Sequence, residues 1–125
     1  MDTRKKILTI EQARQIPRPV AMAIGCFDVL RASTIRELEG ARRDSGTREC
    51  RLLAVVVPSD PEVLSAAARA EMAAALRMVD YVVTADPATA DRLGEFLGCF
   101  PILRLSAADA LRARELKDDV RSRQK

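Results

Sequence analysis

Residues 23–38 read AIGCFDVLRASTIREL, and this stretch decides the fold. It continues an apolar run that starts at Val20 and ends just before Gly25, which predicts a strand buried on both of its faces. Ile35, Leu38 and Ala41 follow at helical spacing and predict a helix directly afterwards. A buried strand that turns into a helix is a common way to hold a phosphate, because free N–H groups point outward at the helix start.

The alternation of strand and helix continues along the chain. Apolar runs predict strands at residues 52–57, 81–83 and 101–105, and helical patterns cover residues 11–16, 66–78, 87–96 and about 106–125. Parallel strands need crossover connections, so this order predicts an α/β fold, a Rossmann-like three-layer sandwich with a parallel sheet of about four to five strands. We expect one domain over residues 1–125, with the last helix at its C-terminal end.

Short patterns mark the helix starts. A capping box, in which two side chains satisfy free N–H groups of the first turn, occurs as Thr9-Ile-Glu-Gln12 and as Thr34-Ile-Arg-Glu37. The second box predicts that its helix begins near Thr34, and Gly46 lies just past the expected end. Asp86-Pro87 combines a cap residue with a proline suited to the first helical position.

Composition narrows the functional classes. Hydrophobic residues make up 48% of the chain and charged residues 31%, as in folded proteins. The net charge is only +3, acidic and basic residues are interspersed, and 3% aromatic residues leave little to stack on bases, so we expect no nucleic-acid partner. No apolar run has the length of a signal peptide or a membrane span, which predicts a cytoplasmic protein with no membrane partner.

Cysteine and histidine content limits the chemistry. Cys26, Cys50 and Cys99 are widely separated and form no CxxC pair, so we expect buried free thiols and neither disulfides nor a metal site. The chain has no histidine, which excludes mechanisms that use an imidazole as base, ligand or phosphate donor.

The turn after the first strand is the candidate site, because ligands of such folds bind beyond the carboxyl ends of the strands. Gly25 would let a ligand approach the backbone, and Asp28 is a polar residue at the exit of an apolar strand. An alternative stays open in which Gly25 only makes the turn and Asp28 bonds to local backbone N–H groups.

Three blocks of the sequence resemble, in order, the cytidylyltransferase-like nucleotidyltransferases. GCFDVL before a helix is similar to the Gly-Cys/Thr-Phe-Asp stretch that precedes Leu-His-x-Gly-His in that group. Residues 68–72, ARAEM, and residues 76–83, LRMVDYVV, resemble its Glu-Arg-Ala helix and Val-Asp-Tyr-Val-Val strand. The resemblance covers about residues 18–97 and is strongest to the heptose-1-phosphate adenylyltransferase domain and to glycerol-3-phosphate cytidylyltransferase.

The resemblance implies a chemistry and a set of residues. In that family two histidines and nearby N–H groups bind a nucleoside triphosphate while a sugar or polyol phosphate attacks it and pyrophosphate leaves. An active member would use CTP or ATP with Mg²⁺, and relatives are often homodimers. The positions that would bind nucleotide or phosphate, if binding is retained, are Gly25, Cys26, Phe27, Asp28, Arg31, Ser33, Thr34 and Arg69.

The chain departs from the family where the chemistry should be. Arg31, Ser33 and Thr34 stand at the positions of the histidine, glycine and second histidine, and Ile24 replaces a polar residue. The family's Lys-Gly loop before the arginine-bearing helix is missing, and so are its closing motifs after Cys99. Loss of one preorganised donor typically lowers a rate by about 10²- to 10³-fold, so we expect no transfer by the family mechanism and assign no catalytic residue.

The replacements are open to two interpretations. Thr34 and Glu37 would cap the helix from within and take up the N–H groups that a phosphate needs. Arg31, with the Ser33 hydroxyl, could instead hold a phosphate, unless Arg31 pairs with Glu37 at the surface.

Three functional hypotheses follow. The preferred one is a nucleotidyltransferase-like domain without transferase activity that binds a nucleotide, a phosphorylated ligand or a protein partner. The second is a divergent active enzyme that transfers CMP or AMP to a sugar or polyol phosphate with Mg²⁺, using Arg31 and Arg69. The third is an assembly module without a ligand, whose Ala-rich helix at residues 66–76 packs against a second copy; the alternative for these small residues is the chain's own core.

Overall fold

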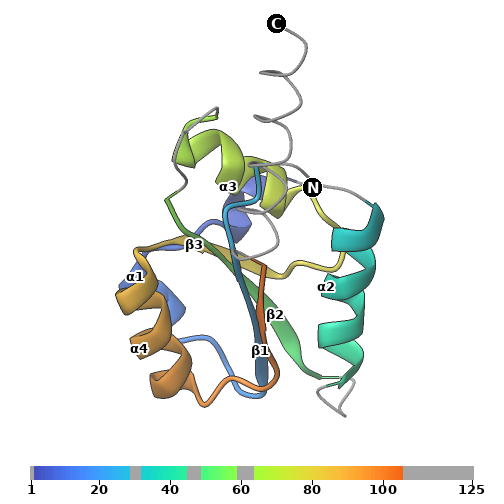
Figure 1. Cartoon of the computed structure of the whole chain (residues 1–125). Coiled ribbons are helices and arrows are strands. Elements are labelled where there is room, and N and C mark those ends of the chain that lie inside the picture. The colour runs from blue at the N-terminus through green and yellow to red at the C-terminus, as the bar shows by residue number, and fades with distance from the viewer. Residues whose placement is uncertain (1, 29–31, 45–48, 59–63, 106–125) are drawn as a thin grey trace, which may run out of the picture.

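The computed structural model describes residues 2–28, 32–44, 49–58 and 64–105. Within these residues, four parallel strands form one sheet in the order β3-β2-β1-β4, and helices cover both of its faces (Figure 1). The strands are β1 (Val20–Gly25), β2 (Arg51–Val56), β3 (Tyr81–Thr84) and β4 (Ile102–Arg104). The helices are the 3-10 turn η1 (Thr3–Lys6), α1 (Ile10–Ala13), α2 (Ala32–Asp44), α3 (Ala66–Ala74) and α4 (Pro87–Leu97). The predicted Rossmann-like three-layer α/β fold is confirmed.

The core lies in two layers, one on each face of the sheet. Successive side chains of a strand point to opposite faces, so Ala21 and Ala23 pack with α2 and α3, while Met22 and Ile24 pack with α1 and α4. All six residues of β1 are buried, as the continuous apolar run predicts for a central strand. Each fully buried large aliphatic side chain contributes about 1.5–3 kcal/mol to stability.

Two of the three predicted helix starts are confirmed. At α1, the Gln12 N–H donates to the Thr9 hydroxyl at 3.2 Å and the Thr9 N–H donates to the Gln12 side-chain oxygen at 2.9 Å. At α4, the Asp86 carboxylate accepts the Thr89 N–H at 2.6 Å, and Pro87 occupies the first turn. Both starts depend only on residues within one turn of each other, which is why the sequence reveals them.

The third helix begins near the predicted position, but its predicted capping box does not fit the helix bounds. Helix α2 begins at Ala32, so Thr34 lies inside its first turn and is not the cap of a Thr34–Glu37 box. Thr34 is 2% exposed and shares the inward face of α2 with Leu38 and Ala41, whereas the Glu37 side chain is exposed. The threonine side chain is therefore buried on the inward face of α2 and does not stand at the helix end.

The sequence predicts that the helix starting at Ala66 ends at residue 78, but α3 ends four residues earlier, at Ala74. The chain turns there, with the Leu76 N–H donating to the Ala73 carbonyl and the Val79 N–H donating to the Leu76 carbonyl. This turn brings Val79 fully into the core just before β3. Gly46 and the expected C-terminal helix at about 106–125 lie outside the described residues.

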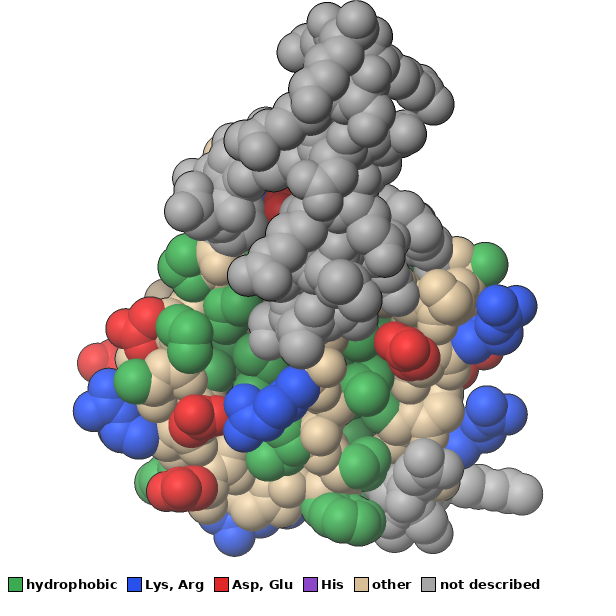
Figure 2. Space-filling model, viewed as in Figure 1, with side chains coloured by type: hydrophobic (Ala, Val, Ile, Leu, Met, Phe, Trp, Pro, Cys, Tyr) green, Lys and Arg blue, Asp and Glu red, His purple; other side chains and the backbone are tan. Residues whose placement is uncertain are grey.

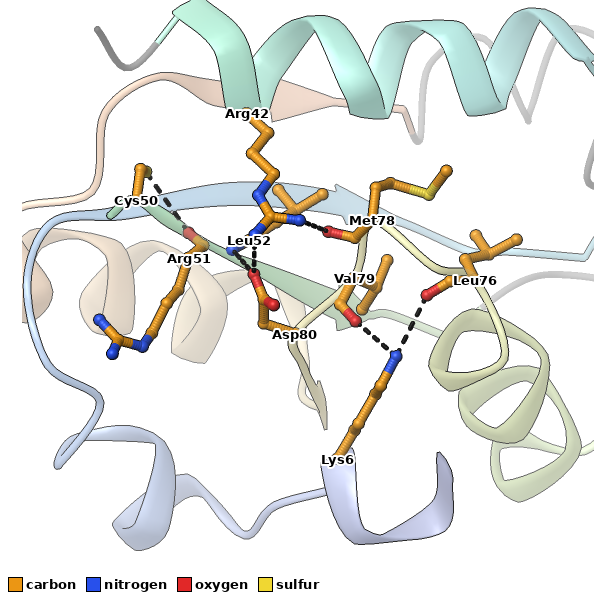
Figure 3. Close-up of polar contacts among 9 residues, drawn as sticks. All are labelled: Lys6, Arg42, Cys50, Arg51, Leu52, Leu76, Met78, Val79 and Asp80. Atoms are coloured by element: carbon orange, nitrogen blue, oxygen red, sulfur yellow. Dashed lines mark hydrogen bonds and ion pairs between the residues drawn. The ribbon is translucent and has the colours of Figure 1, made fainter. Parts of the chain in front are cut away.

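Polar side chains fix the segment between α3 and β3 from two sides (Figure 3). The Asp80 carboxylate accepts the Leu52 N–H at 2.9 Å, and the Asp80 N–H donates to the Leu52 carbonyl at 3.0 Å. Arg42 of α2 lies 3.6 Å from that carboxylate and donates to the Met78 carbonyl at 3.4 Å. From η1, the Lys6 ammonium donates to the carbonyls of Leu76, at 3.2 Å, and Val79, at 2.8 Å. These contacts set the register with which β3 joins β2.

Candidate ligand site at the end of β1

The strand order places the candidate site at the carboxyl end of β1. Strands β2 and β3 lie on one side of β1, and β4 lies on the other side. The direction in which successive strands are added to the sheet therefore reverses between β1 and β4. In open parallel sheets, ligands bind at this reversal, outside the carboxyl ends of the strands. Helix α2 begins on the same side, seven residues after Gly25, at Ala32.

The backbone of the turn takes an uncommon conformation. Phe27 has a φ of 57°, in the left-handed region, and its side chain is only 1% exposed, within the core layer under α2 and α3. Such a backbone costs a bulky residue about 1–3 kcal/mol, which burial of the ring offsets. Gly25 ends β1, and its carbonyl accepts the Val57 N–H at 3.0 Å. The turn is therefore held by core packing as well as by the sheet.

Arg69 lies one turn into α3, beneath this site. Its side chain is 1% exposed, and Nη1 donates to the carbonyl of Cys26 at 3.0 Å and to that of Val57 at 2.7 Å. Nε donates to the Leu64 carbonyl at 3.2 Å. The guanidinium thus joins the end of β1, the end of β2 and the start of α3.

Asp28 provides the counter-charge for Arg69. One oxygen of its carboxylate, Oδ1, lies 3.5 Å from Arg69 Nε, and the Asp28 side chain is 23% exposed. This oxygen is buried and has no hydrogen-bond partner among the described residues. The two side chains form an ion pair without a short hydrogen bond, so the arginine presents little net positive charge to a ligand.

The other predicted site residues are placed differently. Cys26 is half-buried, with its sulfur 3.7 Å from the Pro58 carbonyl. Ser33 is half-buried in the first turn of α2, and Thr34 beside it is buried. Arg31 lies outside the described residues. The structure therefore brings Cys26, Asp28 and Arg69 into direct contact, and places Ser33 and Thr34 at the start of the adjacent helix.

The partners of Arg69 are what sequence reasoning misses. They are main-chain carbonyls, at Val57, Leu64 and Cys26, and a carbonyl carries no sequence signature. Arginine is mostly exposed in proteins and is rarely buried without partners. A single arginine among the alanines of a helix is therefore expected at the surface.

Two of the three cysteines are buried, as expected. Cys50 and Cys99 are buried, Cys26 is half-buried, and all three are free. Burial raises the pKa of the Cys99 thiol to about 11, with Cys50 adding to the rise and Arg18 opposing it. In the described part of the chain, no three acidic, cysteine or histidine side chains gather as a metal site. No helix there is long and apolar enough to cross a membrane.

Comparison with known proteins adds no family assignment. No known protein family matches the chain, and no curated protein is significantly similar to it. The likeness to the nucleotidyltransferases therefore depends on the three sequence blocks.

Proposed function

We propose that this chain is a nucleotidyltransferase-like domain that binds a nucleotide or a related phosphorylated small molecule at the end of β1 and catalyses no transfer. The absence of transfer is carried by one observation, the burial of Arg69. Its guanidinium is 1% exposed and donates to three main-chain carbonyls. An arginine in this state stabilises the fold at the position where the resemblance would have it bind phosphate.

Loss of transfer follows from the missing donors. A transferase of this kind must stabilise the charge that develops on the α-phosphate, and each lost donor costs about 10²- to 10³-fold in rate. The chain has no histidine, and the Asp28 carboxylate offsets the positive charge of Arg69.

Retention of binding is supported by the start of α2. Helix α2 has 13 residues, and it begins beyond the strand-order reversal between β1 and β4. The first N–H groups of a helix and its dipole attract an anion. The half-buried Ser33 hydroxyl adds a side-chain donor in the same turn.

Calorimetric titration of the full chain tests the proposal, with CTP, ATP, CMP, AMP and a set of sugar phosphates, each with and without Mg²⁺. The same mixtures are assayed for pyrophosphate. The proposal expects binding of at least one phosphorylated compound and no pyrophosphate above the protein-free control.

Two results would contradict the proposal in different ways. Pyrophosphate release from a triphosphate and a sugar or polyol phosphate would support the divergent transferase instead. Absence of binding by every compound would support the assembly module without a ligand.

A further inference from the structure

Exposed apolar side chains gather where α4 ends. Phe96, in the last turn of α4, is 52% exposed, and Phe100, in the loop before β4, is 71% exposed. Ile102, the first residue of β4, is 40% exposed. These are the large hydrophobic side chains that the described part of the chain leaves exposed. Apolar clusters of this kind mark interaction surfaces.

Two arginines from the connection between α1 and β1 lie against the same place. The guanidinium carbon of Arg14 lies 5.4 Å from the centroid of the Phe96 ring. Arg18 Nη2 donates to the Phe96 carbonyl at 2.5 Å. Both arginines are exposed, and neither forms an ion pair with a carboxylate of the described residues. We call the surface formed by Arg14, Arg18, Phe96, Phe100 and Ile102 the α4-end surface; it is apolar and positively charged.

The backbone places this surface at the amino end of the sheet. The Phe100 N–H donates to the Val20 carbonyl, at the first residue of β1, at 3.0 Å. In Figure 1, the end of α4 and the start of β1 lie together at the bottom of the view, and Figure 2 shows hydrophobic and basic side chains along that lower edge. The candidate ligand site is at the carboxyl end of β1. A partner at the α4-end surface would therefore leave the ligand site accessible.

Charge limits what the α4-end surface binds. A second copy of the chain, meeting it about a twofold axis, would bring the arginines of the two copies together. Residues 106–125 hold six basic and four acidic side chains, so their net charge has the same sign as that of the arginines. An occupant that complements both the arginines and the phenylalanines is anionic and also accepts apolar side chains.

We propose that the α4-end surface binds reversibly to an anionic lipid bilayer. Phe96 and Phe100 enter the boundary between headgroups and acyl chains, and Arg14 and Arg18 meet the negative charge of the headgroups. A bilayer is favoured over an acidic protein because it accepts projecting rings without a pocket of matching shape. The proposal is independent of the proposed ligand site.

Composition gives no sign of such a surface. The net charge of the whole chain is only +3, and the surface combines residues 14–18 with residues 96–102, which are distant in the sequence. The expectation of no membrane partner depends on the lack of a long apolar run, and binding at a lipid surface requires no such run.

Co-sedimentation of the full chain with lipid vesicles tests the proposal. One set of vesicles contains phosphatidylcholine alone, and the other contains equal parts of phosphatidylcholine and phosphatidylserine. We expect binding to the second set only, and added salt should weaken it because salt screens the charge of the headgroups. Binding no stronger to phosphatidylserine vesicles than to phosphatidylcholine vesicles would overturn the proposal and leave an acidic protein as the occupant.

Matched variants test whether the α4-end surface is responsible. Arg14→Glu should weaken vesicle binding about tenfold or more, whereas Arg36→Glu makes the same charge change at an exposed position of α2 and should not. Phe100→Ser should also weaken binding, and Phe100→Leu, which keeps an apolar side chain, should largely retain it. Equal effects of Arg14→Glu and Arg36→Glu, or unchanged binding by Phe100→Ser, would overturn the proposal.

Discussion

Arg69 of α3 donates a 2.7 Å hydrogen bond to the carbonyl of Val57, directly after β2, from a side chain that is 1% exposed. The same nitrogen reaches the Cys26 carbonyl at 3.0 Å, directly after β1. One guanidinium therefore ties together the ends of the two central strands at the edge where ligands of this fold bind. The position that the resemblance assigns to phosphate binding is part of the scaffold.

Arg69→Ala should lower the free energy of unfolding by about 3–5 kcal/mol, because it leaves buried carbonyls without donors and the Asp28 carboxylate without its counter-charge. Urea denaturation measures the change. Arg92→Ala, on the exposed face of α4, should change stability by no more than about 0.5 kcal/mol. If Arg69 served to bind a ligand and did not stabilise the fold, the Arg69→Ala variant would be as stable as the wild type.

Asp80→Ala should destabilise the protein by about 1–3 kcal/mol, since the buried Leu52 N–H loses its acceptor and Arg42 loses one ion-pair partner. Asp80→Asn keeps an acceptor oxygen and should cost less than Asp80→Ala. Equal losses in the two variants would show that charge, and not the hydrogen bond to Leu52, is what matters at this position. The comparison again uses urea denaturation.

Asp86 should contribute to the acid sensitivity of the fold. The Thr89 N–H and hydroxyl at the start of α4 lower the pKa of the Asp86 carboxyl below its ordinary value of 3.8. A lowered folded pKa stabilises the protein above the unfolded pKa, and this stability is lost as the pH falls through the folded value. Asp86→Asn keeps a capping oxygen but does not titrate, so its unfolding free energy should fall less steeply between about pH 4 and pH 2.

The three cysteines should differ in reactivity. Burial raises the pKa of the Cys99 thiol to about 11, so the thiol stays protonated and shielded near neutral pH. Iodoacetamide at about pH 8 should modify the half-buried Cys26 before the buried Cys50 and Cys99. Peptide mass spectrometry reads out each site, and in denaturant all three should react. Modification of Cys99 as fast as Cys26 in the native protein would disagree with this packing.

The sequence predicts features that depend on neighbouring residues. Three such features are confirmed by the structure: the Thr9 capping box, the Asp86 cap and the buried apolar run of β1. Each depends on residues only a few positions apart. The same box pattern fails at Thr34, which lies inside the first turn of α2 and is buried. Burial depends on the packing of the whole fold and not on the neighbouring residues. Local patterns carry no information about such contacts.

The candidate site could be located but not described in advance. The strand-to-helix turn after Gly25 indicates where a ligand would bind, whereas the burial of Arg69 depends on carbonyls of three other segments. The place of β4 at one end of the described sheet is equally invisible, because strand order depends on the whole topology and not on residues 102–104.

The central claim is that a phosphorylated ligand binds against the first turn of α2 without being transferred, and one matched pair of variants tests it most directly. Ser33→Asp places a negative charge at the second residue of α2, and Ala88→Asp places the same charge at the second residue of α4. Both substitutions suit a helix N-terminus, so both variants should fold. For the phosphorylated compound that binds the wild type, calorimetry should show about tenfold or more weaker binding to Ser33→Asp and unchanged binding to Ala88→Asp. Equal affinities of the two variants would contradict the account.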